Sequence, residues 1–434
     1  MYSVSITAVG GDTSVTAAES DFGQGLGRAL FYCGLFASSL TAFRAAGLTL
    51  GDILLGLSLI PALVSRAVRP RKEAPIGNVT VAVALLLVVG GAISTSTAII
   101  PIESLAVLAR LLFLALVLPW QATYLLATAP DLRRAVTWFA AGGAVCGFGT
   151  LIQAQFGAGV IPGAELTTAG RYTGFAQHVS DTGGITSISI VLSIGLLLTA
   201  TRALQRILAI LFLVGGGIGL ILSGSVSGMI AVLVGLTVLV VGGAMKIRYL
   251  ALTAVVASLV FYVAAAIQSA TTGALNPLQR FLQTIGVTAD GQYSTTEIRS
   301  ETYQVALAAV GRHPFVGAGL DNTSSIVDGV FPAHNLLLAA TYQGGVLLLA
   351  GIVIAIARPF AGRWIPRART ATTVFLLGGA ASAFVFAMTA PSMYNRYFWL
   401  PIVFVMVAKS LTIRGELALG PSPGPWDAAN RVVR

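Results

Sequence analysis

A histidine beside an apolar run is the first residue of this chain that could do chemistry. His334 lies in AHNLLLAATYQGG, where a long polar segment meets an apolar stretch. Imidazole has a reference pKa of about 6.5 and can take a proton from a hydroxyl near neutral pH. A histidine that caps a helix or lies at a membrane interface is the simpler interpretation. His178 and His313, in other polar segments, are weaker candidates.

Arginines supply the second kind of chemistry. The three lysines, Lys72, Lys246 and Lys409, are all expected on the cytoplasmic side, whereas the outer segments carry arginine alone. A planar guanidinium binds phosphate oxygens through paired hydrogen bonds, and an ammonium acts only as a point charge. Arginines around a cavity would suit a diphosphate group. The alternative is that membrane topology depletes lysine and leaves a few solvated arginines.

One further arginine is costly where it stands. Arg110 lies in the apolar sequence LARLLFLAL. A charge at membrane depth costs about 2.5–3.5 kcal/mol on insertion scales. Arg110 should therefore face a cavity or a partner, unless its side chain reaches the interface near Glu103.

Motifs of soluble enzymes are absent from the sequence. We find no P-loop, no GxSxG and no Cys/His spacing for a metal, so we expect neither a metal nor another cofactor. The two cysteines, Cys33 and Cys146, lie in apolar stretches and are interpreted as small buried hydrophobes.

Composition indicates the solvent of the folded chain. Of its 434 residues 56% are hydrophobic and 10% are charged, whereas soluble domains carry roughly a quarter charged residues. The net charge of +10 is spread over short runs between apolar stretches, which argues against nucleic acid as a partner. We therefore predict an all-α polytopic membrane protein.

Apolar segments of membrane-spanning length set the expected helix count. We expect about twelve transmembrane helices, at 27–43, 48–65, 77–98, 104–127, 136–157, 183–200, 206–223, 227–245, 249–268, 334–357, 371–390 and 397–412.

The distribution of basic residues predicts the orientation. With the N-terminus in the cytoplasm, 19 of the 26 lysines and arginines fall in cytoplasmic segments, as the positive-inside rule requires. Six arginines then face outward: Arg44, Arg171, Arg280, Arg299, Arg312 and Arg396.

The expected organisation follows from these spans. We predict a cytoplasmic segment at 1–26, helices one to nine at 27–268 with a smaller outer loop at 158–182, a large outer loop at 269–333, helices ten to twelve at 334–412 and a disordered cytoplasmic tail at 413–434. In the large loop, a Ser-x-x-Glu capping box at Ser294–Glu297 predicts a helix over 295–310. An interfacial helix is expected just after Asn276-Pro277.

Three outer stretches resemble the O-antigen ligase and O-antigen polymerase family of bacterial membrane glycosyltransferases. RYTGF, from Arg171, is similar to the family's Arg-x-x-Gly-aromatic segment. EIRSETYQVALAAVGRHPFVGAGLDN, from Glu297, resembles its arginine-bearing helix followed by a Pro-x-x-Gly-x-Gly turn. His334 and Gly345 fit the ligases' spacing of a histidine, ten residues and a glycine. The chain departs from the family's frequent Ser-Arg pair at Ser225-Val226.

The resemblance implies a GT-C-like enzyme of the bacterial inner membrane with an outward-facing active site. Its donor would be a glycan on a polyprenyl diphosphate such as undecaprenyl diphosphate, and its acceptor a lipid, glycan or protein. Arg171 and Arg299, with Arg280 as helper, would bind the diphosphate. His334 would activate the acceptor hydroxyl, without metal or nucleotide. Arg110 and Gly345 complete the set of candidate site residues.

Two alternatives stay open. A polymerase would join lipid-linked repeat units of a surface polysaccharide instead of handing the glycan to another acceptor. A twelve-helix secondary transporter or flippase would also fit the helix count. The structured outer loop and the shortage of buried carboxylates for ion coupling argue against transport.

Overall fold

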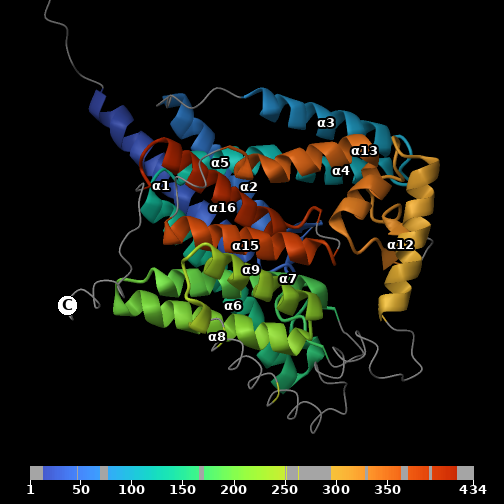
Figure 1. The fold of residues 1–434 in the computed structure, drawn as a ribbon. Coiled ribbons are helices and arrows are strands. Elements are labelled where there is room, and N and C mark those ends of the chain that lie inside the picture. Colours follow the sequence, from blue (N-terminus) through green and yellow to red (C-terminus); the bar gives the residue numbers. More distant parts are fainter. Residues whose placement is uncertain are drawn as a thin grey trace, which may run out of the picture.

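Apolar helices form a bundle in the computed structural model, which describes residues 13–45, 47–68, 77–165, 171–249, 251, 262, 295–327, 331–362, 370–390 and 393–417. The long helices run side by side, and one helix, α12, stands across one end of them (Figure 1). The helical elements are α1 (Thr13–Ala37), α2 (Leu50–Val68), α3 (Asn78–Thr95), α4 (Pro101–Leu112), the π-helical turn η1 (Phe113–Val117), α5 (Leu118–Leu125), α6 (Ala129–Phe156), the 3-10 turn η2 (Ala158–Val160), α7 (Val179–Leu198), α8 (Ala203–Ser223), α9 (Val226–Val241), α12 (Thr295–Arg312), α13 (Leu336–Ala357), the 3-10 turn η3 (Arg358–Phe360), α15 (Ala371–Ala387) and α16 (Arg396–Ile413).

Two short antiparallel hairpins accompany the helices. In one, β1 (Arg44–Ala45) pairs with β2 (Leu48–Thr49), and in the other, β3 (Ile326–Val327) pairs with β4 (Phe331–Pro332). The first hairpin joins α1 to α2, and the second lies between α12 and α13.

Membrane-spanning helices are confirmed. Within the described residues, eight helices are long and apolar enough to cross a bilayer: α2, α3, the continuous α4–α5 helix, α6, α7, α8, α13 with η3, and α16. The apolar helices α9 and α15 are shorter. The expected span at 249–268 lies almost wholly outside the described residues, so the count of twelve stays a prediction.

Several helices begin earlier than the apolar segments suggested. α6 begins at Ala129 rather than 136, because the Thr128 hydroxyl accepts a hydrogen bond from the Asp131 amide and caps the helix. α7 begins at Val179, inside the segment expected to be loop until 182. Hydropathy marks only the apolar part of a helix, whereas capping decides where the backbone becomes helical.

Glycines allow the helices to approach closely. A Cβ on Gly147 of α6 would lie 2.0 Å from the carbonyl oxygen of Gly215 in α8, and one on Gly142 would lie 2.2 Å from that of Phe36 in α1. Helices in a bilayer associate through such small-residue contacts. α6 is therefore packed backbone to backbone against both neighbours.

The connections gather at two opposite ends of the bundle. At what we call the loop end, the Ala42 amide bonds to Phe175 O (3.0 Å), the Tyr172 amide to Leu222 O (3.1 Å), and the Ile99 amide to the Ser324 hydroxyl (3.1 Å). At the other end, which we call the basic end, four side chains bond to carbonyls of neighbouring turns. They are Arg133 (on Thr199 O), Arg414 (on Ala127 O) and Lys409 (on Arg358 O and Ala361 O), with Tyr32 on Asp131 O. Each of these hydrogen bonds thus joins segments that are predicted to lie on the same side of the membrane.

Candidate active site

His334 lies at the loop end, between strand β4 and helix α13. Its backbone carbonyl accepts a 2.7 Å hydrogen bond from the Tyr303 hydroxyl of α12. Burial is the main cause that lowers the pKa of the His334 ring, and the nearby positive charge of Arg299 lowers it further. A hydrogen bond to the backbone of Pro332 opposes both effects.

The tautomer of this ring follows from its partner. Proline has no N–H, so the bond between His334 and the Pro332 backbone must run from a ring N–H to the carbonyl. In the neutral imidazole the other ring nitrogen is then an acceptor. Because its lowered pKa keeps His334 neutral near pH 7, that second nitrogen can take a proton from a hydroxyl.

Helix α12 brings an arginine to the histidine. Arg299 and Tyr303 are four residues apart and so share one face of the helix. The Nε of Arg299 is buried and has no hydrogen-bond partner among the described residues. The charge of Arg299 lowers the pKa of the His334 ring, so the two side chains are neighbours, and the guanidinium keeps a donor free.

Asn335 connects this pair to the rest of the bundle. Its side-chain oxygen caps α13 by accepting from the amides of Leu337 (3.0 Å) and Leu338 (3.1 Å). Its side-chain nitrogen donates to Met388 O, at the end of α15, over 3.3 Å. The position of His334 is thus determined by α12, α13 and α15 together.

Gly345 marks a break in α13. Its backbone, at φ 69° and ψ −179°, is not helical. A Cβ there would lie 2.4 Å from Phe315 O. Backbone groups that lack helical partners at the break bond instead to the Pro-x-x-Gly-x-Gly turn. The Val346 amide donates to Pro314 O (2.9 Å), and the Ala318 amide donates to Tyr342 O (2.8 Å). Gly345 thus brings no side chain to the site. Its role is to allow that turn to pack closely against α13.

Arg171 reaches the loop end from another element. Its Nε donates to Ser223 O over 2.6 Å, and the amide of Tyr172 donates to Leu222 O, so the RYTGF segment is attached to the turn between α8 and α9. Ser225 caps α9 in this same turn, and the departure from the family's Ser-Arg pair is the next residue, Val226, which begins α9. Arg171 and the His334–Arg299 pair thus come from separate parts of the chain to one end of the bundle.

The other sequence candidates have different surroundings. Arg110 of α4 donates to the carbonyl of Gly47 (3.0 Å) in the β1–β2 hairpin. It therefore has the polar partner expected for a charged side chain at membrane depth. His178 pairs with Glu165 and both side chains are about half exposed. His313 is exposed, and Arg280 lies outside the described residues.

Sequence reasoning missed two polar contacts at this end. Asp52 of α2 forms an ion pair with Arg396 of α16, whose side chain is only 6% exposed. The Tyr394 hydroxyl donates to Gln343 Oε1 over 2.8 Å, and burial raises the pKa of Tyr394 to about 12. Two signals in the sequence could have revealed the ion pair: Asp52 lies within an apolar segment, and Arg396 directly precedes another.

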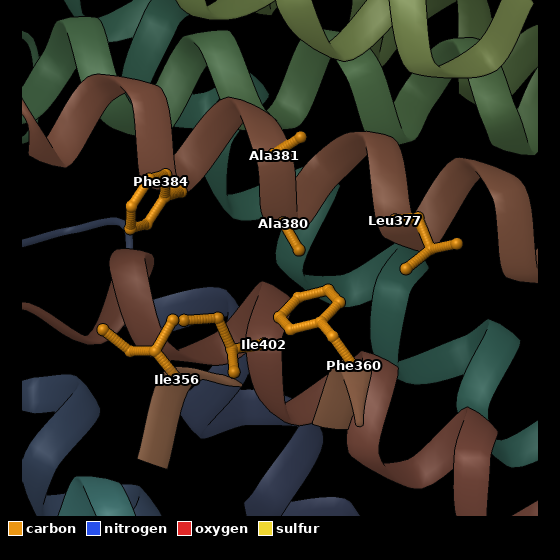
Figure 2. A pocket seen from close by; sticks show the side chains of 7 residues that line it. All are labelled: Ile356, Phe360, Leu377, Ala380, Ala381, Phe384 and Ile402. Carbon is orange, nitrogen blue, oxygen red and sulfur yellow. The ribbon is translucent and has the colours of Figure 1, made fainter. Parts of the chain in front are cut away.

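An apolar groove lies on the side of the bundle, between α13, η3, α15 and α16 (Figure 2). Its volume is about 280 Å³, and its lining is formed by Ile356, Phe360, Leu377, Ala380, Ala381, Phe384 and Ile402. Phe384 lies four residues before Met388, which is about 6 Å along the helix. One end of the groove is therefore one turn below the carbonyl that holds Asn335.

A family comparison covers much of this region. Residues 208–353 match the family model described as O-Antigen ligase. That range contains α12, Arg299, His334 and the break at Gly345. The match confirms the resemblance to the O-antigen ligase family over these residues. Among curated proteins, the comparison yields no match.

In the portion of the chain that the structure describes, no group of three or more His, Cys, Asp or Glu side chains is arranged to bind a metal ion.

Proposed function

We propose that this protein is a membrane glycosyltransferase that moves a glycan from a polyprenyl diphosphate to an acceptor hydroxyl. The observation that carries the proposal is the neutral, oriented His334 beside Arg299, in the region that matches the O-antigen ligase model. A general base and a phosphate-binding cation side by side are what this transfer requires. We place the reaction at the outer face of the bacterial inner membrane, because the positive-inside rule assigns the opposite, basic end to the cytoplasm.

The transfer needs one proton acceptor and one anion site. The acceptor oxygen bonds to the anomeric carbon, and its proton passes to the free ring nitrogen of His334. The bond between the anomeric carbon and the diphosphate oxygen breaks, and its electron pair leaves with the diphosphate. Arg299, whose Nε has no partner among the described residues, and Arg171 stabilise that charge, with Arg280 as a further helper. Direct attack inverts the anomeric centre.

The apolar groove suits the hydrocarbon tail of the donor. Its rim at Phe384 is one helical turn from Met388, which bonds the neighbour of His334. Its lining is made of aliphatic and aromatic side chains, which a polyprenyl chain covers favourably. A diphosphate beside Arg299 would thus have its tail leading into the groove, along the seam between α13 and α15.

The test uses the full chain in liposomes with a labelled polyprenyl-diphosphate glycan and an acceptor. We expect His334→Ala to lower the rate of transfer by about 10²–10⁴-fold, the usual contribution of a general base. The matched control is His313→Ala, because His313 is exposed at the end of α12. Parental transfer by His334→Ala would overturn the assignment of the base.

We favour a ligase over a polymerase, because the spacing of His334 and Gly345 is that of the ligases. The two differ only in the acceptor. Product length on a gel separates them: a ligase transfers one preformed chain, whereas a polymerase generates a ladder of repeats on the carrier.

A further inference from the structure

Three arginines that play no part in the proposed donor site meet at the β1–β2 hairpin. Arg44 lies in β1, and its Nε donates to Thr41 O over 3.1 Å. Arg110 of α4 donates to Gly47 O, in the turn of the hairpin, over 3.0 Å. Arg396 of α16 is reached from β2: the Thr49 amide bonds to Asp52 (2.9 Å), and Asp52 pairs with Arg396. One six-residue hairpin therefore gathers cations from three elements that are far apart in sequence.

Carboxylates also lie near these three arginines. The charge of Asp52 acts on Arg396, those of Arg44 and Arg396 act on Asp181, and Asp321 acts together with Arg110 on Tyr394. Asp52 is already paired with Arg396, and Asp181 accepts hydrogen bonds from Tyr397 (3.0 Å) and Asn395 (3.3 Å).

Donors remain free on these arginines. Arg44 and Arg110 form no ion pair among the described residues. The Nε of Arg396, whose side chain is 6% exposed, has no hydrogen-bond partner in the same part of the chain.

The exposure of the three arginine side chains decreases from Arg44 through Arg110 to Arg396. Arg44 is exposed, Arg110 is half-buried and Arg396 is buried. An anion entering from the loop end would thus meet Arg44 first and Arg110 next. Guanidinium groups bind phosphate oxygens in pairs, and a partly desolvated setting strengthens such bonds.

We infer that Arg44, Arg110 and Arg396 form a second anion site, which binds a phosphate ester on the headgroup of the acceptor lipid. The inference rests on the proposed function, since it gives the donor diphosphate and the acceptor phosphate separate arginines. It assigns to the acceptor a chemical class: a lipid with a phosphorylated headgroup. The same phosphate chemistry is present in ordinary anionic phospholipids, so the test separates the two sources.

The experiment measures KM for acceptor and donor separately, with the full chain in liposomes. Arg44→Gln and Arg110→Gln are the variants; Arg396 is kept, because removing it would leave Asp52 without its partner. For a phosphorylated acceptor we expect each variant to raise KM about tenfold while the donor KM stays within about twofold. For the same acceptor without phosphate, parent and variants should share one high KM. The matched control, Arg312→Gln, alters an exposed arginine at the end of α12 and should change neither constant.

Other results would overturn the inference. If the parent used both acceptors equally well, or if the variants lost activity equally with both, the protein would not recognise the acceptor phosphate. A rate that depends on phosphatidylglycerol in place of phosphatidylcholine, and not on the acceptor phosphate, would assign the site to bulk lipid. Binding of the phosphorylated acceptor, followed as a rise in Tm, requires no turnover. A parent that binds it but transfers nothing would therefore contradict the proposed function and leave the anion site supported.

Discussion

Replacing Gly345 with alanine should destabilise the part of the molecule that holds His334. Gly345 has φ 69° and ψ −179°, a region of backbone space that is almost restricted to glycine. The new methyl group would lie 2.4 Å from Phe315 O and 2.6 Å from its carbonyl carbon. Both neighbours are backbone atoms, so neither can rotate away. The turn from Pro314 to Gly319 must then move from α13.

The magnitude follows from these two effects. Backbone strain of this kind costs about 1–3 kcal/mol, and an overpacked contact costs about the same. Together they reach roughly 2–6 kcal/mol, a large part of the roughly 5–15 kcal/mol that stabilises a typical protein. For a chain of 434 residues this corresponds to a fall in Tm of roughly 2–7 °C. The hydrogen bonds from Val346 to Pro314 and from Ala318 to Tyr342 would weaken with it.

The assay is thermal unfolding of the purified protein, followed by glycan transfer in liposomes. Gly217→Ala is the matched control, because a Cβ at Gly217, inside α8, meets no atom within 4 Å. There alanine should raise helix stability by about 1 kcal/mol, so Tm should stay or rise. If Gly345→Ala kept the parental Tm and transfer rate, the break in α13 would not have the role that we assign to it.

Three further predictions concern the base, the buried ion pair and the groove. Burial and Arg299 lower the pKa of His334, so the ring should stay neutral below pH 6.5, the usual pKa of histidine. Arg299→Gln removes a positive charge and should raise that pKa, so the acidic limb of the variant's residual pH–rate profile should move to higher pH. Asp52→Asn leaves Arg396 buried without its ion pair and should cost about 3–5 kcal/mol in thermal unfolding, whereas Asp52→Leu together with Arg396→Met should recover most of it. Ala380→Trp fills the groove and should raise the donor KM for a long polyprenyl tail while leaving a short-tailed donor unaffected; an equal effect on both would contradict the tail assignment.

The places of several candidate residues in the fold could be predicted from the sequence, because the signals for them are local. His334 opens an apolar run, and Arg299 lies on a helix with its own start signal, so both could be placed near the loop end. Arg110 was expected to need a partner because its cost in the membrane can be judged without any knowledge of neighbours. What could not be predicted was the identity of that partner, the Gly47 carbonyl, since it lies 63 positions away in a hairpin with no strong sequence pattern.

The sequence by itself determined that the chain is a polytopic membrane protein and roughly where its apolar helices lie. Hydropathy and charge decide these features, and both can be summed along the chain without knowing which helices touch. The tertiary structure alone decided that Arg396 pairs with Asp52, 344 positions earlier, and that α13, η3, α15 and α16 leave an apolar groove between them. Such contacts depend on which face of each helix turns toward its neighbour. That choice is made by side-chain and glycine packing across many helices at once, and no single segment contains it.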